Sequence, residues 1–118
     1  MSSPTLQHER EEMQMYATHR RYEGIDQSRI EELSRKVNDD LIPRLSKLPG
    51  FQGYFLIEAG DGVVKSISLF DTATQAEDST RVAAEWTQEE NLEKLVPNPP
   101  KVTTRKVLAH ETKAPALV

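Results

Sequence analysis

The three histidines are the side chains of this sequence best suited to chemistry, because imidazole changes charge near neutral pH and also binds metals. His8 lies in a polar N-terminal stretch, whereas His19 and His110 lie in two segments of strand-like composition. Pairing these segments as antiparallel neighbours places the two imidazoles on the order of 20 Å apart at about 3.3 Å per residue, too far for one metal ion. We therefore expect no metal site within one chain. His19 is the candidate general acid or base, set against the simpler interpretation of a polar residue on a half-exposed strand.

Aromatic side chains form the second set, with one Trp, three Tyr and three Phe in 118 residues. Most fall in segments expected to be strands, and the simplest interpretation is packing in the core and in a dimer interface. A cavity among them would be mainly apolar, with a few polar groups to orient a flat ligand. The candidate ligand-binding residues are His19, Tyr54, Ser68 and Trp86.

Charge and composition exclude several classes of function. The net charge of −4 and the pI near 5.4 indicate neither a nucleic-acid partner nor an anionic membrane partner. The chain has no cysteine, which excludes disulfides and thiolate chemistry. The basic pair Arg20-Arg21, like the acidic pairs elsewhere, is expected to be solvated. Phosphate-binding loops and Ser-His-Asp spacings are not recognisable, so we expect no cofactor.

Polar ends and a patterned centre predict one domain over residues 13–110, with tails at 1–12 and 111–118. The N-terminus has no apolar stretch that resembles a signal peptide or a membrane span. We expect a cytoplasmic protein.

Residue patterning predicts the elements that position the candidate residues. Residues 13–22 alternate like a half-buried strand. A helix then begins with Asp26 as its cap, or with Ser28 and Glu31 as an alternative capping box, and has apolar residues at three- and four-residue steps up to Leu48. Pro43 removes a helical hydrogen bond, which predicts a kink or a re-start of the helix near residues 38–42. Pro49-Gly50 ends this helix.

The second half predicts a hairpin, a helix and a strand. Two apolar runs, 53–59 and 63–70, flank "GDG", which is typical of a tight hairpin turn. Thr72 with Gln75 forms a capping box for a helix that turns a face of small residues inward, namely Ala73, Ala76, Thr80 and Ala83. These small side chains either let the helix pack closely on the sheet or leave room for a ligand.

A second Thr-x-x-Glu pattern, Thr87 with Glu90, predicts that this helix breaks near Trp86. A short helix would then continue to about Leu95 and bury Leu92 and Leu95. The prolines of "VPNPPK" prevent further helix, and a last strand is expected over residues 102–110.

The predicted order of strand, helix, strand, strand, helix and strand defines the fold class. It is a ferredoxin-like α+β sandwich with the order βαββαβ, a four-stranded antiparallel sheet and both helices on one face. The other sheet face needs a cover, and the simplest cover is the same sheet of a second copy, which gives a homodimer.

Two stretches, "LPGFQGY" and "SISLFDTATQAEDS", together with this order of elements, resemble the dimeric α+β barrel superfamily. More narrowly, they resemble antibiotic biosynthesis monooxygenase-like domains, over about residues 13–110. The resemblance implies two sheets paired in a dimeric barrel, in a superfamily that includes cofactor-independent oxygenases, haem-degrading enzymes and isomerases. The haem-degrading branch is disfavoured, since the first strand has no Asn and no His lies between residues 20 and 109.

Two functions remain open. The first is a homodimeric protein that binds a small aromatic or apolar molecule, as a cofactor-independent monooxygenase acting on an aromatic or polyketide-like substrate. The alternative is a non-catalytic dimeric binding or stress-responsive module, whose interior is filled by its own side chains.

Overall fold

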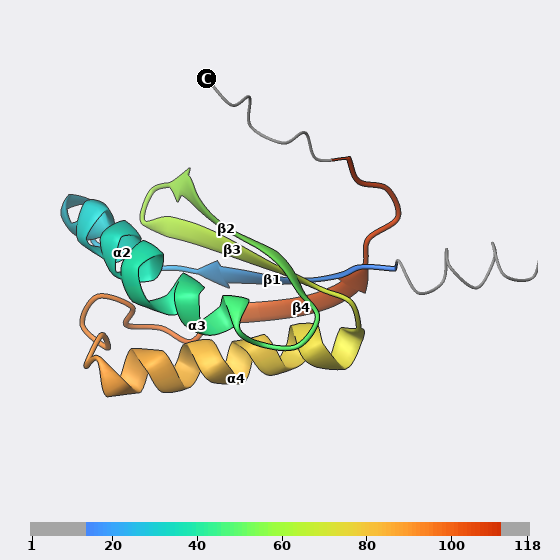
Figure 1. Ribbon diagram of the computed structural model, residues 1–118. Helices are drawn as coiled ribbons and strands as arrows, with labels where there is room; N and C mark the ends of the chain where they lie inside the picture. The colour runs from blue at the N-terminus through green and yellow to red at the C-terminus, as the bar shows by residue number, and fades with distance from the viewer. Residues whose placement is uncertain (1–13, 112–118) are drawn as a thin grey trace, which may run out of the picture.

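A four-stranded antiparallel sheet with helices on one face makes up residues 14–111, the part of the chain that the computed structural model describes (Figure 1). The order along the sheet is β2-β3-β1-β4, and each neighbouring pair is antiparallel. The predicted ferredoxin-like α+β class is therefore confirmed. The predicted tail 1–12, His8, Met13 and residues 112–118 lie outside the described residues. The bounds of the strands are β1 (Tyr16–Tyr22), β2 (Phe51–Gly60), β3 (Val63–Phe70) and β4 (Lys101–Lys106).

Helical structure occurs in two places. Between β1 and β2 lie a 3-10 turn, two α-helical segments and a π-helical turn, and between β3 and β4 lies one long helix. The bounds are η1 (Gln27–Arg29), α2 (Ile30–Lys36), η2 (Val37–Leu41), α3 (Ile42–Ser46) and α4 (Ala73–Glu89). As predicted, Asp26 caps the first of these segments, because its carboxylate accepts a hydrogen bond from the Ser28 amide at 2.9 Å.

The predicted kink is a π-helical turn, η2, placed just before Pro43. The amide of Ile42 bonds five residues back to the Val37 carbonyl, and Pro43 has no amide to donate. The wide turn also keeps the buried stripe aligned. Leu33, Val37, Leu41 and Leu45 are spaced four residues apart, which in a regular α-helix drifts by about 40° per step. A wider turn opposes this drift, and all four side chains are buried.

The hairpin between β2 and β3 has the predicted tight turn. Asp61 and Gly62 both have positive φ, of 55° and 74°, as a type I′ turn requires. Gly50, at the corner before β2, also has positive φ, at 79°. A Cβ there would overlap with Oε1 of Gln75, so this corner packs directly on the start of α4.

The capping box at the start of α4 is confirmed. The Thr72 hydroxyl accepts from the Gln75 amide at 3.1 Å, and the Gln75 side chain accepts from the Thr72 amide at 3.2 Å. Small residues line the buried face as expected, with Ala76 and Ala83 buried, although Ser79 is also fully buried and Thr80 is only partly buried.

The predicted break near Trp86 is wrong. Helix α4 continues to Glu89, and the Thr87 hydroxyl donates to the Ala83 carbonyl at 2.9 Å instead of capping a new helix. The helix ends where Asn91 takes a positive φ of 55°. The following residues form turns, yet Leu92 and Leu95 are buried as predicted. The last strand is also shorter than expected, because it ends at Lys106 and leaves His110 outside it.

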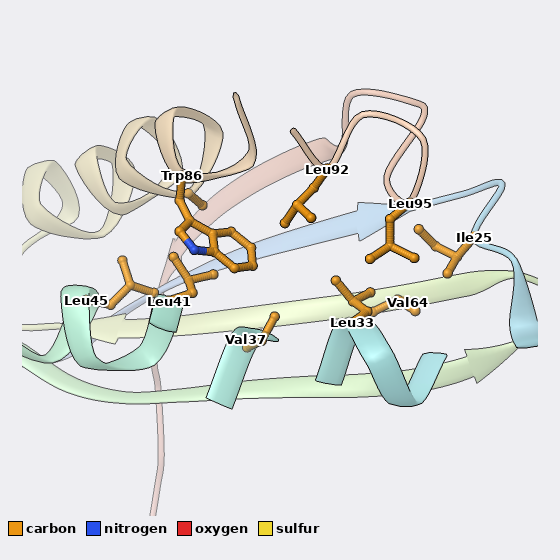
Figure 2. Packing of buried hydrophobic residues seen from close by; sticks show 10 residues of the cluster. Ile25, Leu33, Val37, Leu41, Leu45, Val64, Trp86, Leu92 and Leu95 are labelled. Atoms are coloured by element: carbon orange, nitrogen blue, oxygen red, sulfur yellow. The ribbon is translucent and has the colours of Figure 1, made fainter. Parts of the chain in front are cut away.

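The core lies between the sheet and the helices. Figure 2 shows Trp86 extending from α4 toward Leu41, while Leu95 faces Ile25 and Leu33. At the other end of the sheet, Phe51 and Phe70 meet edge to face with ring centroids 5.6 Å apart. This packing fixes the helices on one face.

The opposite face of the sheet carries exposed apolar side chains. Phe55 and Ile57 on β2 are 50% and 43% exposed, and the register places Phe55 opposite Ile67 of β3, which is opposite His19 of β1. Within residues 14–111, no helix packs on this face (Figure 1). None of the helices within residues 14–111 is both long enough and apolar enough to cross a membrane.

Candidate functional site

A fully buried arginine occupies the centre of the sheet. Alternation along β1 turns Thr18, Arg20 and Tyr22 toward the helices, and both Thr18 and Arg20 are 0% exposed. The prediction that the pair Arg20-Arg21 is solvated is therefore wrong for Arg20. Since residues on one strand face alternate sides, only Arg21 faces away from the helices.

Four hydroxyl groups surround the Arg20 guanidinium, two from β3 and two from α4. Its Nη1 donates to Ser66 Oγ at 3.2 Å and to Ser68 Oγ at 2.9 Å. Its Nη2 donates to Ser79 Oγ at 2.5 Å, and its Nε donates to Thr80 Oγ1 at 2.8 Å. Hydrogen bonds from a charged donor are stronger than neutral ones, so this cage offsets part of the cost of removing the cation from water.

The positive charge of Arg20 is not neutralised by a carboxylate among the described residues. None of the ion pairs within 14–111 includes Arg20. Burial lowers the pKa of Arg20 from its ordinary value. An arginine nevertheless stays protonated in proteins, so the site holds a permanent cation in a poorly solvated place.

Two tyrosines lie beside this cation. Burial raises the pKa of Tyr54 to about 12, and the neighbouring Tyr22 adds to the rise, while Ser66 and Arg20 oppose it. Burial also raises the pKa of Tyr22, against the opposing influence of Arg20 and Ser66. Both phenols are therefore protonated at neutral pH and are available as hydrogen-bond donors.

Trp86 closes the site on the side of the first helical segments. Its Nε1 donates to Asp40 Oδ2 at 2.6 Å, which lowers the pKa of that carboxyl. Asp40 lies in the π-helical turn η2 and also approaches Arg44, with Nε and Oδ1 3.8 Å apart. The π turn thus holds the indole ring in one orientation over the interior.

Two neighbouring hollows lie beside Tyr22. The inner cavity, between the sheet and the helices, has a volume of about 30 Å³ and is lined mainly by apolar side chains, with Tyr22, Tyr54 and Trp86 among them. A groove of about 350 Å³ lies outside it, between α4 and the proline-rich segment 97–100. Tyr22, Thr87 and Val96 line both hollows, so the groove and the inner cavity are neighbours on either side of these side chains.

The structure brings together three of the four ligand-binding candidates. Tyr54 and Trp86 line the inner cavity, and Ser68 belongs to the hydroxyl cage of Arg20. His19 lies on the opposite face of the sheet, opposite Thr103 and Ile67, so it belongs to the exposed face and not to the cavity. A role for His19 remains a prediction.

Sequence reasoning missed the cage itself, namely Arg20, Ser66, Ser79 and Thr80, together with Tyr22. A usable signal was present, since Thr18, Arg20 and Tyr22 share one strand face and Ser66 and Ser68 share another at the same spacing. Within residues 14–111, no group of three His, Asp or Glu side chains is arranged to bind a metal ion.

The arrangement favours a ligand that carries negative charge on oxygen. Of the caged arginine and its four hydroxyl partners, Thr80 is the residue that lines the groove, so the charge of Arg20 acts on the groove from behind Thr80. A poorly solvated cation in such a place stabilises an anion more than a water-exposed one does. The aromatic lining provides the surface for a flat apolar body.

The fold that these residues build is shared with solved structures, although no family model and no curated protein matches the chain. One is NE2512, a protein of unknown function from Nitrosomonas europaea, with 18% identity over 88% of this chain and 99% of that chain and a TM-score of 0.67.

Another similar structure is a monooxygenase from the gene ActVA-Orf6 of Streptomyces coelicolor in complex with the ligand nanaomycin D. It has 14% identity over 84% of this chain and 92% of that chain, with a TM-score of 0.62. A dimeric ferredoxin-like protein from an uncultured marine organism has 13% identity over 88% of this chain and 96% of that chain, with a TM-score of 0.56. The chain therefore has the ferredoxin-like fold of monooxygenase-like and dimeric proteins, as the sequence resemblance implies.

Proposed function

We propose that the protein is a cytoplasmic homodimer that binds a small aromatic molecule between its sheet and α4. We further propose that it acts as a cofactor-independent monooxygenase on an aromatic or polyketide-like substrate. The observation that carries this proposal is the groove of about 350 Å³, which shares Tyr22 with the inner cavity beside Trp86. Arg20 supplies a buried positive charge behind it.

Similar structures support this choice. The Streptomyces coelicolor protein of the same fold is a monooxygenase solved with nanaomycin D, and the marine protein of the same fold is dimeric. A dimer would also cover the exposed Phe55 and Ile57 on the open sheet face.

The chemistry needs a substrate that can itself reduce oxygen. An acidic methylene beside an aromatic carbonyl loses a proton to give an electron-rich anion, and this anion reacts with O₂. One oxygen atom becomes the new carbonyl oxygen and the other leaves as water. The protein contributes by stabilising the anion, excluding water and orienting the ring.

A second function is favoured by the size of the inner cavity. A volume of about 30 Å³ holds little more than a water molecule, so the interior of the protein is nearly filled by its own side chains. This favours the alternative of a non-catalytic dimeric binding module, in which a ligand occupies the groove alone.

One titration tests binding and a second measurement tests catalysis. Trp86 is the only tryptophan of the chain, so its fluorescence reports on the cavity. A panel of anthrones and quinols is titrated into the protein, and saturable quenching is expected. Oxygen uptake with the same compounds then separates the two functions, because binding without uptake indicates the module.

A matched pair of variants locates the binding. Ala84 lines the groove on α4, whereas Ala109 is exposed and lies outside both hollows. Ala84→Leu fills the groove and is expected to weaken binding by about tenfold or more, a loss of about 1.4 kcal/mol. Ala109→Leu leaves binding unchanged. Absence of quenching by every compound in the wild type contradicts the proposal.

A further inference from the structure

Thr80 connects the buried cation to the groove. Its hydroxyl oxygen accepts the hydrogen bond from Arg20 Nε at 2.8 Å, and the same residue lines the groove beside Tyr22. A molecule in the groove therefore lies against a residue whose hydroxyl group is bonded to a guanidinium.

The hydroxyl hydrogen of Thr80 is available to a ligand. On the same helix, Ser79 donates to the Ala76 carbonyl at 2.6 Å and Thr87 donates to the Ala83 carbonyl at 2.9 Å. Thr80 donates to no group among residues 14–111, although it accepts from a charged donor. Such a bond polarises the hydroxyl and makes it a stronger donor.

Other groove residues restrict the ligand. Ala84, Val96 and the prolines of segment 97–100 provide apolar walls that suit a flat ring. Glu93 also lines the groove and disfavours ligands with several negative charges, such as phosphate esters or dicarboxylates. The lining therefore fits a single anionic oxygen on an aromatic body.

We propose that Thr80, with Arg20 behind it, forms an oxyanion subsite that binds the ionised hydroxyl of an acidic phenol or enol. Binding then releases the phenolic proton to solvent, and the oxygen keeps the negative charge. This inference rests on the proposed function and names the substrate class of the same site. It gives Arg20 the role of a positioning residue, because it acts through Thr80.

Few titratable groups face this subsite. From the sheet these are Arg20, Tyr22 and Tyr54, and from the segment after α4 it is Glu93. The first helical segments present apolar side chains to the inner cavity, and their nearest acid, Asp40, is bonded to Trp86. Glu93 is thus the carboxylate whose own titration has to be separated from that of the ligand.

The test uses 4-nitrophenol and its methyl ether, 4-nitroanisole, as probes. The two have similar rings, but only the phenol ionises, and the visible band of nitrophenolate shows which form is bound. We expect the pKa of bound nitrophenol to fall by about one unit, which equals about tenfold preference for the anion. Because the free phenol ionises as the pH rises, its affinity is expected to increase with pH up to its free pKa, whereas the affinity of the ether stays constant.

Paired variants assign the effect to the subsite. Thr80→Ser keeps the hydroxyl and is expected to retain the lowered pKa, whereas Thr80→Val is expected to abolish it. Arg20→Met is expected to abolish it as well, and Arg20→Lys, which keeps the charge, to retain part of it. Arg81→Met removes an exposed arginine from the same helix and serves as the control. Glu93→Gln should leave the pH dependence in place.

The outcomes separate the two proposals. Binding of both probes with equal affinity at every pH overturns the oxyanion subsite and leaves the proposed binding function intact. Failure of both probes to bind overturns the subsite, whereas the proposed function is overturned only when the anthrones and quinols also fail to bind. A lowered pKa that persists in folded Thr80→Val and Arg20→Met also overturns the subsite, and circular dichroism establishes that these variants are folded.

Discussion

Arg20 differs from most buried arginines in the kind of partner that it has. A carboxylate partner would neutralise the charge within the protein, whereas four hydroxyl groups satisfy the donors and leave the charge in place. The cage is therefore compatible with a cation that serves a ligand. The same hydroxyls hold the guanidinium plane in one orientation.

The raised pKa of Tyr54 leads to a prediction about the stability of the protein at alkaline pH. Its pKa is about 12 in the folded protein and near 10 in the unfolded chain, so the unfolded chain loses this proton first. The contribution to stability is full below pH 10 and is lost as the pH rises toward 12. We expect the free energy of unfolding to fall by about 2–3 kcal/mol across this window.

Urea unfolding at a series of pH values measures this loss. Tyr54→Phe removes the titrating group and should flatten the dependence by a similar amount, while the Tyr22 contribution remains. An unchanged pH profile in Tyr54→Phe contradicts the assignment.

The residues of the cage also show why the site was hard to predict. Arg20 stands next to Arg21 in the sequence, and a pair of adjacent charges usually lies at the surface. Its partners are 46 to 60 residues away in the sequence and are neutral, so no charge pattern indicates the contact. Only strand alternation gives a local signal. Tyr54 and Trp86 were predicted because aromatic side chains usually line small-molecule sites.

At the scale of elements, the sequence correctly predicted those turns and helix caps that depend on a few adjacent residues. The turn at Asp61-Gly62, the capping box at Thr72 and the irregular turn before Pro43 all follow from backbone requirements of single residues. The end of α4 did not follow, because Thr87 has the same sequence spacing as a cap but bonds to its own helix.

The positive φ and close packing at Gly50 lead to a second prediction, which concerns stability. Gly50→Ala places a methyl group where the Gln75 side chain lies and also imposes an unfavourable φ. We expect a loss of about 2–3 kcal/mol in stability, from about 1–2 for the left-handed backbone and about 1 for the broken capping box. Urea unfolding measures the loss.

Gly60→Ala is the matched control for this prediction, because Gly60 has a φ of 85° and no atom lies within 4 Å of the place that a methyl group would take there. It should show only the backbone cost. In a Gln75→Ala background, Gly50→Ala should cost about 1 kcal/mol less than in the wild type. Equal costs for the two glycines would show that the corner does not support the cap.

For the whole molecule, the exposed sheet face is the feature that most directly suggests assembly. Its apolar residues, including Phe55, Ile57 and Ile67, come from neighbouring strands and form one surface. Polar His19 lies within that surface, in register with Ile67. A second copy that covers the face would bury these side chains together.

Phe55→Asp tests this assembly. A charge among the exposed apolar residues of this face is expected to weaken the dimer by about thirtyfold or more, a loss of about 2 kcal/mol. Analytical ultracentrifugation of the variant should show monomers at concentrations where the wild type is a dimer. Leu108→Asp, at a 91% exposed position outside the sheet, is the control and should remain dimeric. A monomeric wild type contradicts the homodimer.

The pairing of β1 with β4 determines at which end of the sheet a tag or a fused reporter joins the domain. Tyr16 pairs with Lys106, so the described chain enters and leaves the sheet at the same end, whereas Tyr22 and the groove lie at the other end of β1. Six residue steps along the strand separate the two ends by about 20 Å. Residues 14–111 therefore continue into both flanking segments from the end of the sheet remote from the groove, which favours attachment through these segments in immobilised binding assays.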